Sequence, residues 1–420
     1  MSDGASLTWG IAVLTALGII IRPFRWPEAV WAVAGAGLLV ALGLLSLAEA
    51  WIGVGKGFDV YLFLIGMMLL SELARREGLF DWLAAVATRH ARGSPRRLFA
   101  LIYIVGTVVT VFLSNDATAV VLTPAVYAAT KAAKVKTPLP YLLICAFIAN
   151  AASFVLPISN PANLVIFGGG HMPPLGRWLA TFALPSLVAI VITFVTLYWT
   201  QRRVLARDRV EGQVDSPILS ATAKLAAVGL VITALILVGA SALGRDLGFP
   251  TFVCGILTAG VIVIVGRQSP AETLRGLSWS VLPLVAGLFV IVQALEKTGL
   301  TGILADHLSG SAAAAPGQTA AVAGLAVAFL ANLVNNLPAG LVAGGAVQAA
   351  HASDTVSGAI LIGIDLGPNL SVTGSLATIL WLHALRREGL HVGAWAFLKI
   401  GTVVMVPALL LSLLALIALH

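Results

Sequence analysis

Charged residues are scarce in this sequence. Asp, Glu, Lys and Arg make up 10% of its 420 residues, whereas a soluble domain carries about 25%. Hydrophobic residues reach 59%, and apolar runs of roughly 20 residues, long enough to span a bilayer, recur along the chain. The composition excludes a soluble globular protein and predicts an all-α membrane protein. The first run, Leu7 to Ile21, has no basic start and no small-residue cleavage site, so we interpret it as a span rather than a signal peptide.

Cysteine and several motifs are also lacking. The two cysteines, Cys145 and Cys254, lie in separate apolar runs without metal-ligand spacing, so we expect packing residues and neither disulfides nor a metal cofactor. No Gly-x-x-x-x-Gly-Lys-Ser/Thr loop occurs, which excludes an ATPase within this chain. The net charge of +7 is typical of loops that orient a membrane protein, and we expect no nucleic-acid partner.

Ten apolar segments have the length of transmembrane spans. They are residues 6–21, 28–51, 58–75, 139–166, 177–199, 223–243, 249–266, 278–296, 356–382 and 395–419. Two longer stretches, 98–130 and 318–350, are interrupted by polar residues and are predicted to be re-entrant hairpins. With this arrangement, all but four of the 25 Lys and Arg residues fall on one side of the membrane. Because positive loops stay in the cytoplasm, the sequence predicts a bacterial inner-membrane protein with both termini in the periplasm.

The two halves of the chain resemble each other. Gly66 to Leu70 aligns with Gly287 to Ile291, and with the same offset Ser114-Asn115-Asp116 aligns with Asn335-Asn336-Leu337. Five spans separate equivalent points, so the halves are predicted to be inverted repeats, the usual construction of secondary transporters. The expected parts are residues 1–200 with hairpin 98–130 and broken helix 139–166, a cytoplasmic linker at 201–222, and residues 223–420 with hairpin 318–350 and broken helix 356–382.

Four polar clusters interrupt the apolar sequence, and each combines Asn, Ser or Thr with a nearby Gly or Pro. Proline breaks helices, and broken backbone at membrane depth persists only where protein buries it or a wet cavity adjoins it. We therefore predict that the breaks converge on one cavity, although such side chains can also simply join helices. The expected substrate-binding residues are Ser114, Asn115, Asp116, Thr118, Asn150, Ser159, Asn160, Asn163, Asn335, Asn336, Asn369, Thr373, Ser375 and Thr378.

Two of the residues in these clusters are acidic. A carboxylate near the bilayer midplane costs roughly 2.5–3.5 kcal/mol on the insertion scale, and desolvation favours its protonated form. Asp116 and Asp365 are therefore the predicted proton-coupling residues. The alternative interpretation is a carboxylate that only caps a broken helix, which applies most directly to Asp365.

The four clusters resemble motifs of the arsenite efflux permeases, a family of the ion transporter superfamily. The matching segments are Phe112 to Asp116 with Leu122-Thr123-Pro124, Leu156 to Leu164, Asn335 to Pro338, and Asp365 to Asn369 with Thr373 to Thr378 and Trp381-Leu382-His383. The resemblance implies export of arsenite and antimonite in exchange for protons. Some relatives associate with a soluble arsenical ATPase subunit, so the resemblance leaves such a partner open.

The chain departs from some family members at Asn150 and Asn369, where those members carry an acid and a lysine. If the two charges form a pair elsewhere, their joint loss here is consistent, and Asp116 and Asp365 remain as proton candidates. An ion-coupled carrier of carboxylates or other small anions stays as the main alternative, since helix N-termini alone could hold an anion. An intramembrane enzyme is a remote alternative, because the clusters contain no His and the sequence has no zinc signature. A channel is a further alternative, but inverted repeats with broken helices favour alternating access.

Overall fold

The computed structural model describes residues 3–167, 172–211 and 218–419, and every regular element in these ranges is helical. The first half contains α1 (Asp3–Ile21), η1 (Pro23–Arg25), α2 (Glu28–Ala41), α3 (Leu47–Lys56), α4 (Phe58–Arg76), α5 (Leu79–His90), α6 (Pro95–Phe112), α7 (Asn115–Ala117), η2 (Thr118–Leu122), α8 (Thr123–Ala132), α9 (Leu139–Ala151), η3 (Pro157–Ser159), α10 (Pro161–Phe167) and α11 (Leu175–Arg207). The second half contains α12 (Ala221–Ala242), α13 (Gly248–Gly266), α14 (Pro270–Gly276), α15 (Val281–Lys297), α16 (Leu300–Ala314), α17 (Pro316–Val334), α18 (Asn336–Ala349), α19 (Asp354–Leu366), η4 (Gly367–Leu370), α20 (Leu376–Arg387) and α21 (Ala394–Leu419).

Seven of the described helices are long and apolar enough to cross a membrane, and the number rises to nine if each of two bent pairs is one span. The bent pairs are α3–α4, with a bend of 50°, and α14–α15, with a bend of 46°. Large apolar side chains face outward on several of these helices, for example Leu14, Leu235 and Ile264. Such an outer surface is stable in lipid and not in water, so the protein is a multi-pass membrane protein.

The span predicted at residues 28–51 is wrong at its C-terminal end. Helix α2 stops at Ala41, and a turn through Gly43, whose φ is +70°, leads to a new helix at Leu47. Ser46 and Glu49 start α3 with a capping box, in which each side chain bonds the other residue's backbone N–H. The apolar run conceals this start because the turn itself is built from Leu and Gly residues.

The chain breaks inside all four predicted interruptions. The first hairpin region breaks at Leu113–Ser114, between α6 and α7, and the second at Asn335, between α17 and α18. The two predicted broken helices are interrupted between α9 and α10 and between α19 and α20. Asn335 has φ +74° and ψ 153°, a combination that costs a residue with a side chain about 1–3 kcal/mol. The second hairpin therefore turns through strained backbone.

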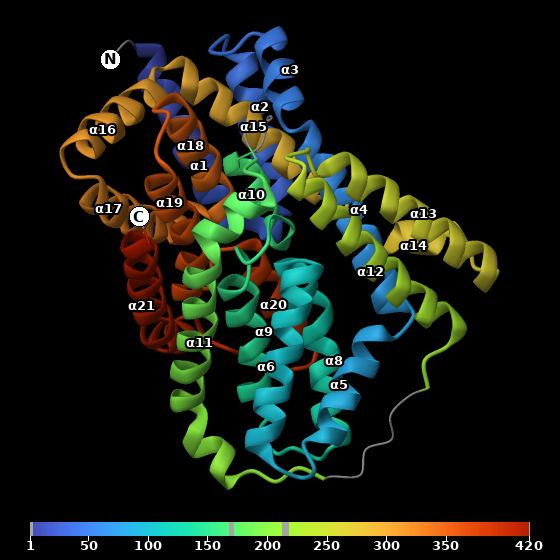
Figure 1. Ribbon diagram of the computed structural model, residues 1–420. Coiled ribbons are helices and arrows are strands. Elements are labelled where there is room, and N and C mark those ends of the chain that lie inside the picture. The colour runs from blue at the N-terminus through green and yellow to red at the C-terminus, as the bar shows by residue number, and fades with distance from the viewer. Residues whose placement is uncertain (1–2, 168–171, 212–217, 420) are drawn as a thin grey trace.

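Packing between the halves is reciprocal. Helix α4 of the first half packs on α13 of the second, and α15 of the second half packs on α2 of the first. Gly66 and Gly287 allow these two crossings, because a Cβ atom would clash with the backbone of Thr251 in one and of Ala32 in the other. The long helices α11 and α21, which end the two halves, lie side by side on the left of Figure 1.

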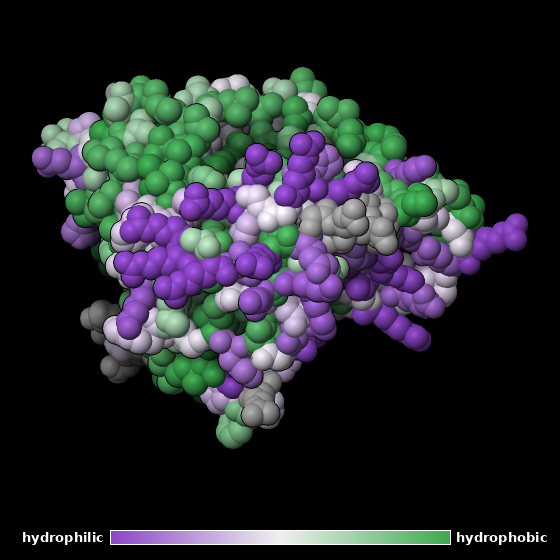
Figure 2. Space-filling model, turned by 90° about the horizontal axis from the view of Figure 1, so that it is seen from below, coloured by the Kyte–Doolittle hydropathy of each residue, from purple (hydrophilic) through white to green (hydrophobic). Residues whose placement is uncertain are grey.

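The lower end of the molecule in Figure 1 carries the loops that leave α5 and α11, while the N-terminus lies at the upper end. Seen from below, hydrophilic side chains gather across the middle of the molecule and a broad hydrophobic area adjoins them (Figure 2). Part of the predicted linker, residues 212–217, lies outside the described residues.

Candidate functional site

Four helices begin at the breaks, and the first residue of each is preceded by a polar side chain that caps it. The Ser114 hydroxyl accepts from the N–H of Ala117 at α7, and the Ser375 hydroxyl accepts from that of Thr378 at α20. At α10 the Asn160 carbonyl oxygen accepts from the Ala162 N–H, 3.0 Å away. Asn335 does the same for Leu337 at α18. Each cap satisfies a donor that the helix start would otherwise leave unpaired.

The four capped starts meet around one small cavity of about 20 Å³, room for roughly one water molecule. Its lining consists of Leu64, Asn115, Asp116, Asn160, Pro161, Val281, Asn336, Leu337, Ser375, Leu376 and Ala377. In the sequence alignment of the two halves, Asn115 falls opposite Asn336. Asn160 and Ser375 are alike in the structure, since each caps the helix that follows a break. Asp116 matches Leu337, so one carboxylate distinguishes two otherwise similar walls.

A larger cavity of about 660 Å³ adjoins the small one and shares Leu64, Asp116, Pro161, Val281 and Leu376 with it. Its rim carries charged residues from the ends of α4 and α20, including Glu72, Arg75 and Arg387. The Arg75 guanidinium donates two hydrogen bonds to the Glu72 carboxylate, at 2.7 and 2.6 Å. We call this larger cavity the vestibule, and the polar residues that line the small cavity the wall. Asp116 is partly exposed and lies where the two cavities meet.

Asp81 of the vestibule lies on α5, outside the candidate spans. Burial raises the pKa of its carboxyl group above the ordinary value, and the nearby Arg75 partly offsets this shift. The larger cavity is thus lined by acidic side chains, including Glu72 and Asp81, and by basic side chains, including Arg75.

Several predicted site residues bond backbone instead of reaching the small cavity. Ser159 is fully buried and its hydroxyl donates to the Val111 carbonyl, which joins the first broken helix to the first hairpin. Thr118 pairs with Thr110, within 2.8 Å, at the start of the π-helical turn η2. Asn163 donates to the Ser153 carbonyl and to two further carbonyls of the 152–160 loop. These side chains shape the breaks.

In the second broken helix too, some predicted site residues bond to neighbouring parts of the chain and do not line the small cavity. Thr378 contacts the Ser375 hydroxyl at 3.0 Å, and the Thr373 hydroxyl donates to the Asn332 carbonyl. The N–H of Asn336 bonds the Gly374 carbonyl at 3.0 Å, so the second hairpin tip is tied to the loop between α19 and α20. Thr378 and Thr373 thus support the wall from behind.

Asn150 and Asn369 contact each other directly. The Asn150 amide donates to the Asn369 side-chain oxygen at 3.0 Å, and the Asn369 amide donates to the Phe147 carbonyl. Both residues are buried. The two asparagines therefore form a neutral pair between the two halves.

Asp365 lies behind the small cavity and does not line it. Its side chain is buried, with one carboxyl oxygen 2.8 Å from the Asn160 amide nitrogen and the other 2.6 Å from the Ser153 hydroxyl. Ser153 was not predicted as a site residue, although its place between Asn150 and Ser159 in one interrupted helix was a usable signal. Asn332, three residues before the second hairpin tip at Asn335, was not predicted either. Its amide donates to the carbonyls of Ala328 and Gly367.

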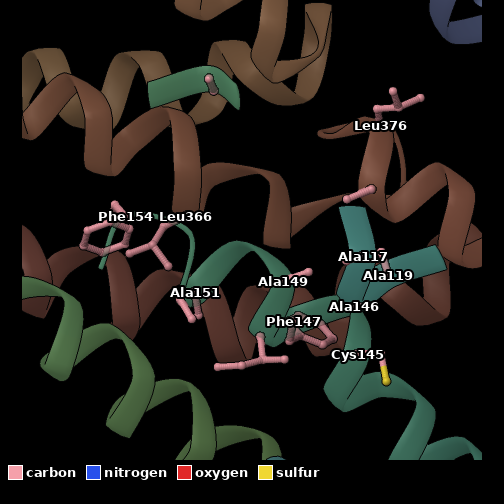
Figure 3. Packing of buried hydrophobic residues seen from close by; sticks show 14 of the residues in the cluster. Ala117, Ala119, Cys145, Ala146, Phe147, Ala149, Ala151, Phe154, Leu366 and Leu376 are labelled. Atoms are coloured by element: carbon pink, nitrogen blue, oxygen red, sulfur yellow. The ribbon is translucent and has the colours of Figure 1, made fainter. Parts of the chain in front are cut away.

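The side chains that usually hold metal ions do not cluster among the described residues. No group of three or more His, Cys, Asp or Glu side chains there could hold a metal ion. Cys145 on α9 and Cys254 on α13 are free and buried. Figure 3 shows Cys145 next to Ala146, below the segment that carries Ala117 and Ala119.

Comparisons with known proteins agree with the membrane architecture. The family model described as citrate transporter matches residues 16–364. The arsenical pump membrane protein of Escherichia coli (strain K12) is 30% identical, with 98% of each chain covered. The protein of the same name from Yersinia enterocolitica is 31% identical over 84% of each chain. Among solved structures, the Alcanivorax borkumensis YdaH transporter has a TM-score of 0.54 at 17% identity, covering 88% of this chain and 86% of its own. At that identity the likeness concerns the fold alone.

Proposed function

We propose that this chain, which belongs to the arsenical pump membrane protein family, exports arsenite and antimonite across the inner membrane in exchange for protons. Membership makes it a secondary transporter and not an enzyme. The observation that carries the substrate assignment is the wall of Asn115, Asn160, Asn336 and Ser375 around the small cavity. Arsenite at neutral pH is mainly an uncharged trihydroxide, and amide and hydroxyl groups both donate to and accept from such hydroxyls. The adjoining larger cavity supplies the room that the small one lacks.

The proposed architecture has ten spans and two re-entrant hairpins in two inverted repeats, residues 1–200 and 223–420, joined by a cytoplasmic linker at 201–222. Reciprocal packing of α4 on α13 and of α15 on α2 supports the repeat. So does the pairing of Ser114 with Asn335 as equivalent helix caps. Inverted repeats with broken helices at the midplane are the construction on which alternating access works.

The residues on the rim of the vestibule support a proposal for which side is open. Its rim includes Arg75 and Arg387, which belong to the predicted cytoplasmic set of basic residues. With positive loops in the cytoplasm, this structure represents the state from which arsenite enters the site. Both termini then face the periplasm.

Asp116 is the proposed proton-coupling residue. It lines both cavities and has no symmetric counterpart, since Leu337 stands at the equivalent position. The fold therefore does not require an acid there. Because neutral arsenite cannot respond to voltage by itself, a proton carried on this carboxylate supplies the drive for export.

Everted membrane vesicles test the substrate. With an acid interior, protons leave the vesicle through the transporter, and arsenite should accumulate inside against its gradient. Vesicles without the protein are the control. Accumulation of succinate or citrate in place of arsenite would refute the assignment.

The coupling residue has its own test in the same vesicles. Asp116→Asn should abolish accumulation driven by the pH gradient while exchange of arsenite for arsenite continues, because exchange moves no net proton. Asp354→Asn is the matched control, since Asp354 pairs with Arg177 away from both cavities and should leave accumulation unchanged. Accumulation by Asp116→Asn at the wild-type rate would show that another group carries the proton.

A carrier of carboxylates or other small anions is the second candidate. The citrate transporter family model covers residues 16–364, and four helix N-termini around one cavity would favour an anion. The lining of the small cavity contains the acid Asp116 and no basic side chain, and this lining together with the identity to the arsenical pump proteins weighs against an anion carrier. The comparison of arsenite with succinate and citrate in the vesicles decides between the two.

A further inference from the structure

Asp365 on α19 is a buried acid without a cationic partner. Its exposed fraction is 0%. The elements that pack on α19 are α9, α10, α11, α17, α18, α21 and η4. Among the described residues these elements bring no Lys, Arg or His side chain into a hydrogen bond or ion pair with it; its partners are Ser153 and Asn160. An ionised carboxylate buried without a countercharge is very costly, and such a group normally takes up a proton instead.

The hydrogen bonds of Ser153 also indicate a protonated Asp365. Its hydroxyl oxygen lies 2.7 Å from the Asn150 carbonyl oxygen and 2.6 Å from an Asp365 carboxyl oxygen. Both distances are those of good O–H···O hydrogen bonds. A serine hydroxyl has one proton, and a backbone carbonyl can only accept. If Ser153 donates to Asn150, the second short contact requires a proton from Asp365.

We propose that Asp365 stays protonated and uncharged and acts as a positioning residue for Asn160, not as the carrier of the exchanged proton. Its hydroxyl donates to Ser153, whose hydroxyl donates to the Asn150 carbonyl. Its other oxygen accepts from the Asn160 amide. The assignment rests on the proposed function only in taking the small cavity as the substrate site.

The consequence concerns the orientation of one wall residue. The Asn160 amide nitrogen is committed to Asp365 and its oxygen accepts from the Ala162 N–H at the start of α10. Both ends of the amide are thus held, and Asn160 presents a fixed face to the cavity that it lines. A wall held in this way is preorganised for the substrate.

An isosteric substitution tests the proposal. In Asp365→Asn the new amide can donate to Ser153 and its oxygen can still accept from Asn160. This variant should insert normally and keep arsenite accumulation driven by the pH gradient, with the wild-type pH profile. Asp365→Ala leaves the Asn160 amide without its acceptor, and accumulation should fall by about tenfold or more. Asp116→Asn, by contrast, should lose accumulation. The two variants together therefore distinguish the residue that carries the proton from the residue that positions Asn160.

A second measurement does not depend on transport. Infrared spectra of the purified protein, with ¹³C-labelled aspartate to assign the band, should show a protonated carboxyl that persists at alkaline pH and is absent from Asp365→Asn. This band decides the inference even if the protein proves to move a substrate other than arsenite. The proposal is overturned if the band is missing, if Asp365→Asn loses gradient-driven accumulation while retaining exchange, or if Asp365→Asn fails to insert.

Discussion

The cysteines are the residues on which arsenic chemistry would most directly depend. Trivalent arsenic favours thiolates, and a trap of three thiolates would hold it too tightly for release. Cys145 and Cys254 lie on different helices, and both are buried. Neither lines the small cavity. The side chains that line the small cavity carry amide, hydroxyl and carboxyl groups and no thiol.

We predict that both cysteines are dispensable. The double variant Cys145→Ser, Cys254→Ser should confer arsenite resistance on a pump-deficient host at the wild-type level, because neither thiol faces the cavity. Membrane expression, measured by immunoblot, is the control. Loss of resistance at normal expression would show that a thiolate takes part in transport.

The neutral pair of Asn150 and Asn369 should matter for stability. Asn369→Ala removes the acceptor of the Asn150 amide and the donor to the Phe147 carbonyl. Leaving a buried polar group unpaired costs about 1–3 kcal/mol, so thermal unfolding in detergent should occur at a clearly lower temperature. Asn332→Ala on α17 removes an amide that donates to the carbonyls of Ala328 and Gly367, and provides a second variant that loses side-chain amide bonds to backbone. An unchanged unfolding temperature for Asn369→Ala would mean that water replaces the pair.

At the scale of elements, four short helices begin inside the protein, and each is capped by its own side chain. Each cap occupies one N–H donor of its helix start, which is then not free to bind a substrate. The residues directly after two of the caps, Asn115 and Asn336, line the cavity in their place. The broken helices therefore act mainly by presenting side chains.

Helix crossings between the two halves depend on glycine. Gly66→Val should destabilise the contact of α4 with α13, because its side chain would overlap the backbone of Thr251. Overpacking of this kind costs about 1–3 kcal/mol, occasionally more. Gly260→Val on α13 is the matched control, since nothing lies within 4 Å of its added Cβ atom. Equal unfolding temperatures for the two variants would contradict the close crossing.

At the scale of the whole molecule, orientation in the membrane follows from charge. In a cysteine-free background, Ser6→Cys should react with a membrane-impermeant thiol reagent added to intact spheroplasts. Arg209→Cys should react only after the membrane is opened. Both positions are exposed, so accessibility reports the side of the membrane. Labelling of both from outside would contradict the proposed topology.

Much of this architecture was predictable from the sequence because apolar length and polar interruption are local signals. The breaks near Ser114, Ser159, Asn335 and Asn369 lie inside the predicted interruptions, and the family resemblance is confirmed by the arsenical pump relatives. The prediction of the span 28–51 was wrong at its C-terminal end for a local reason as well. The turn consists of Leu and Gly residues, and the short capping pattern of Ser46 and Glu49 lies inside an otherwise apolar run.

By itself the sequence determined the membrane class, the family, the places where helices break and the residues that could act there. Only the tertiary structure decided which of those residues reach the cavity and which bond backbone. It placed Asn160 on the wall and Ser159 behind it, although they are neighbours in the chain. The physical reason is that a polar side chain inside a membrane protein turns toward its nearest partner. For Asn160 that partner is Asp365, 205 residues away, and local sequence carries no record of such a contact.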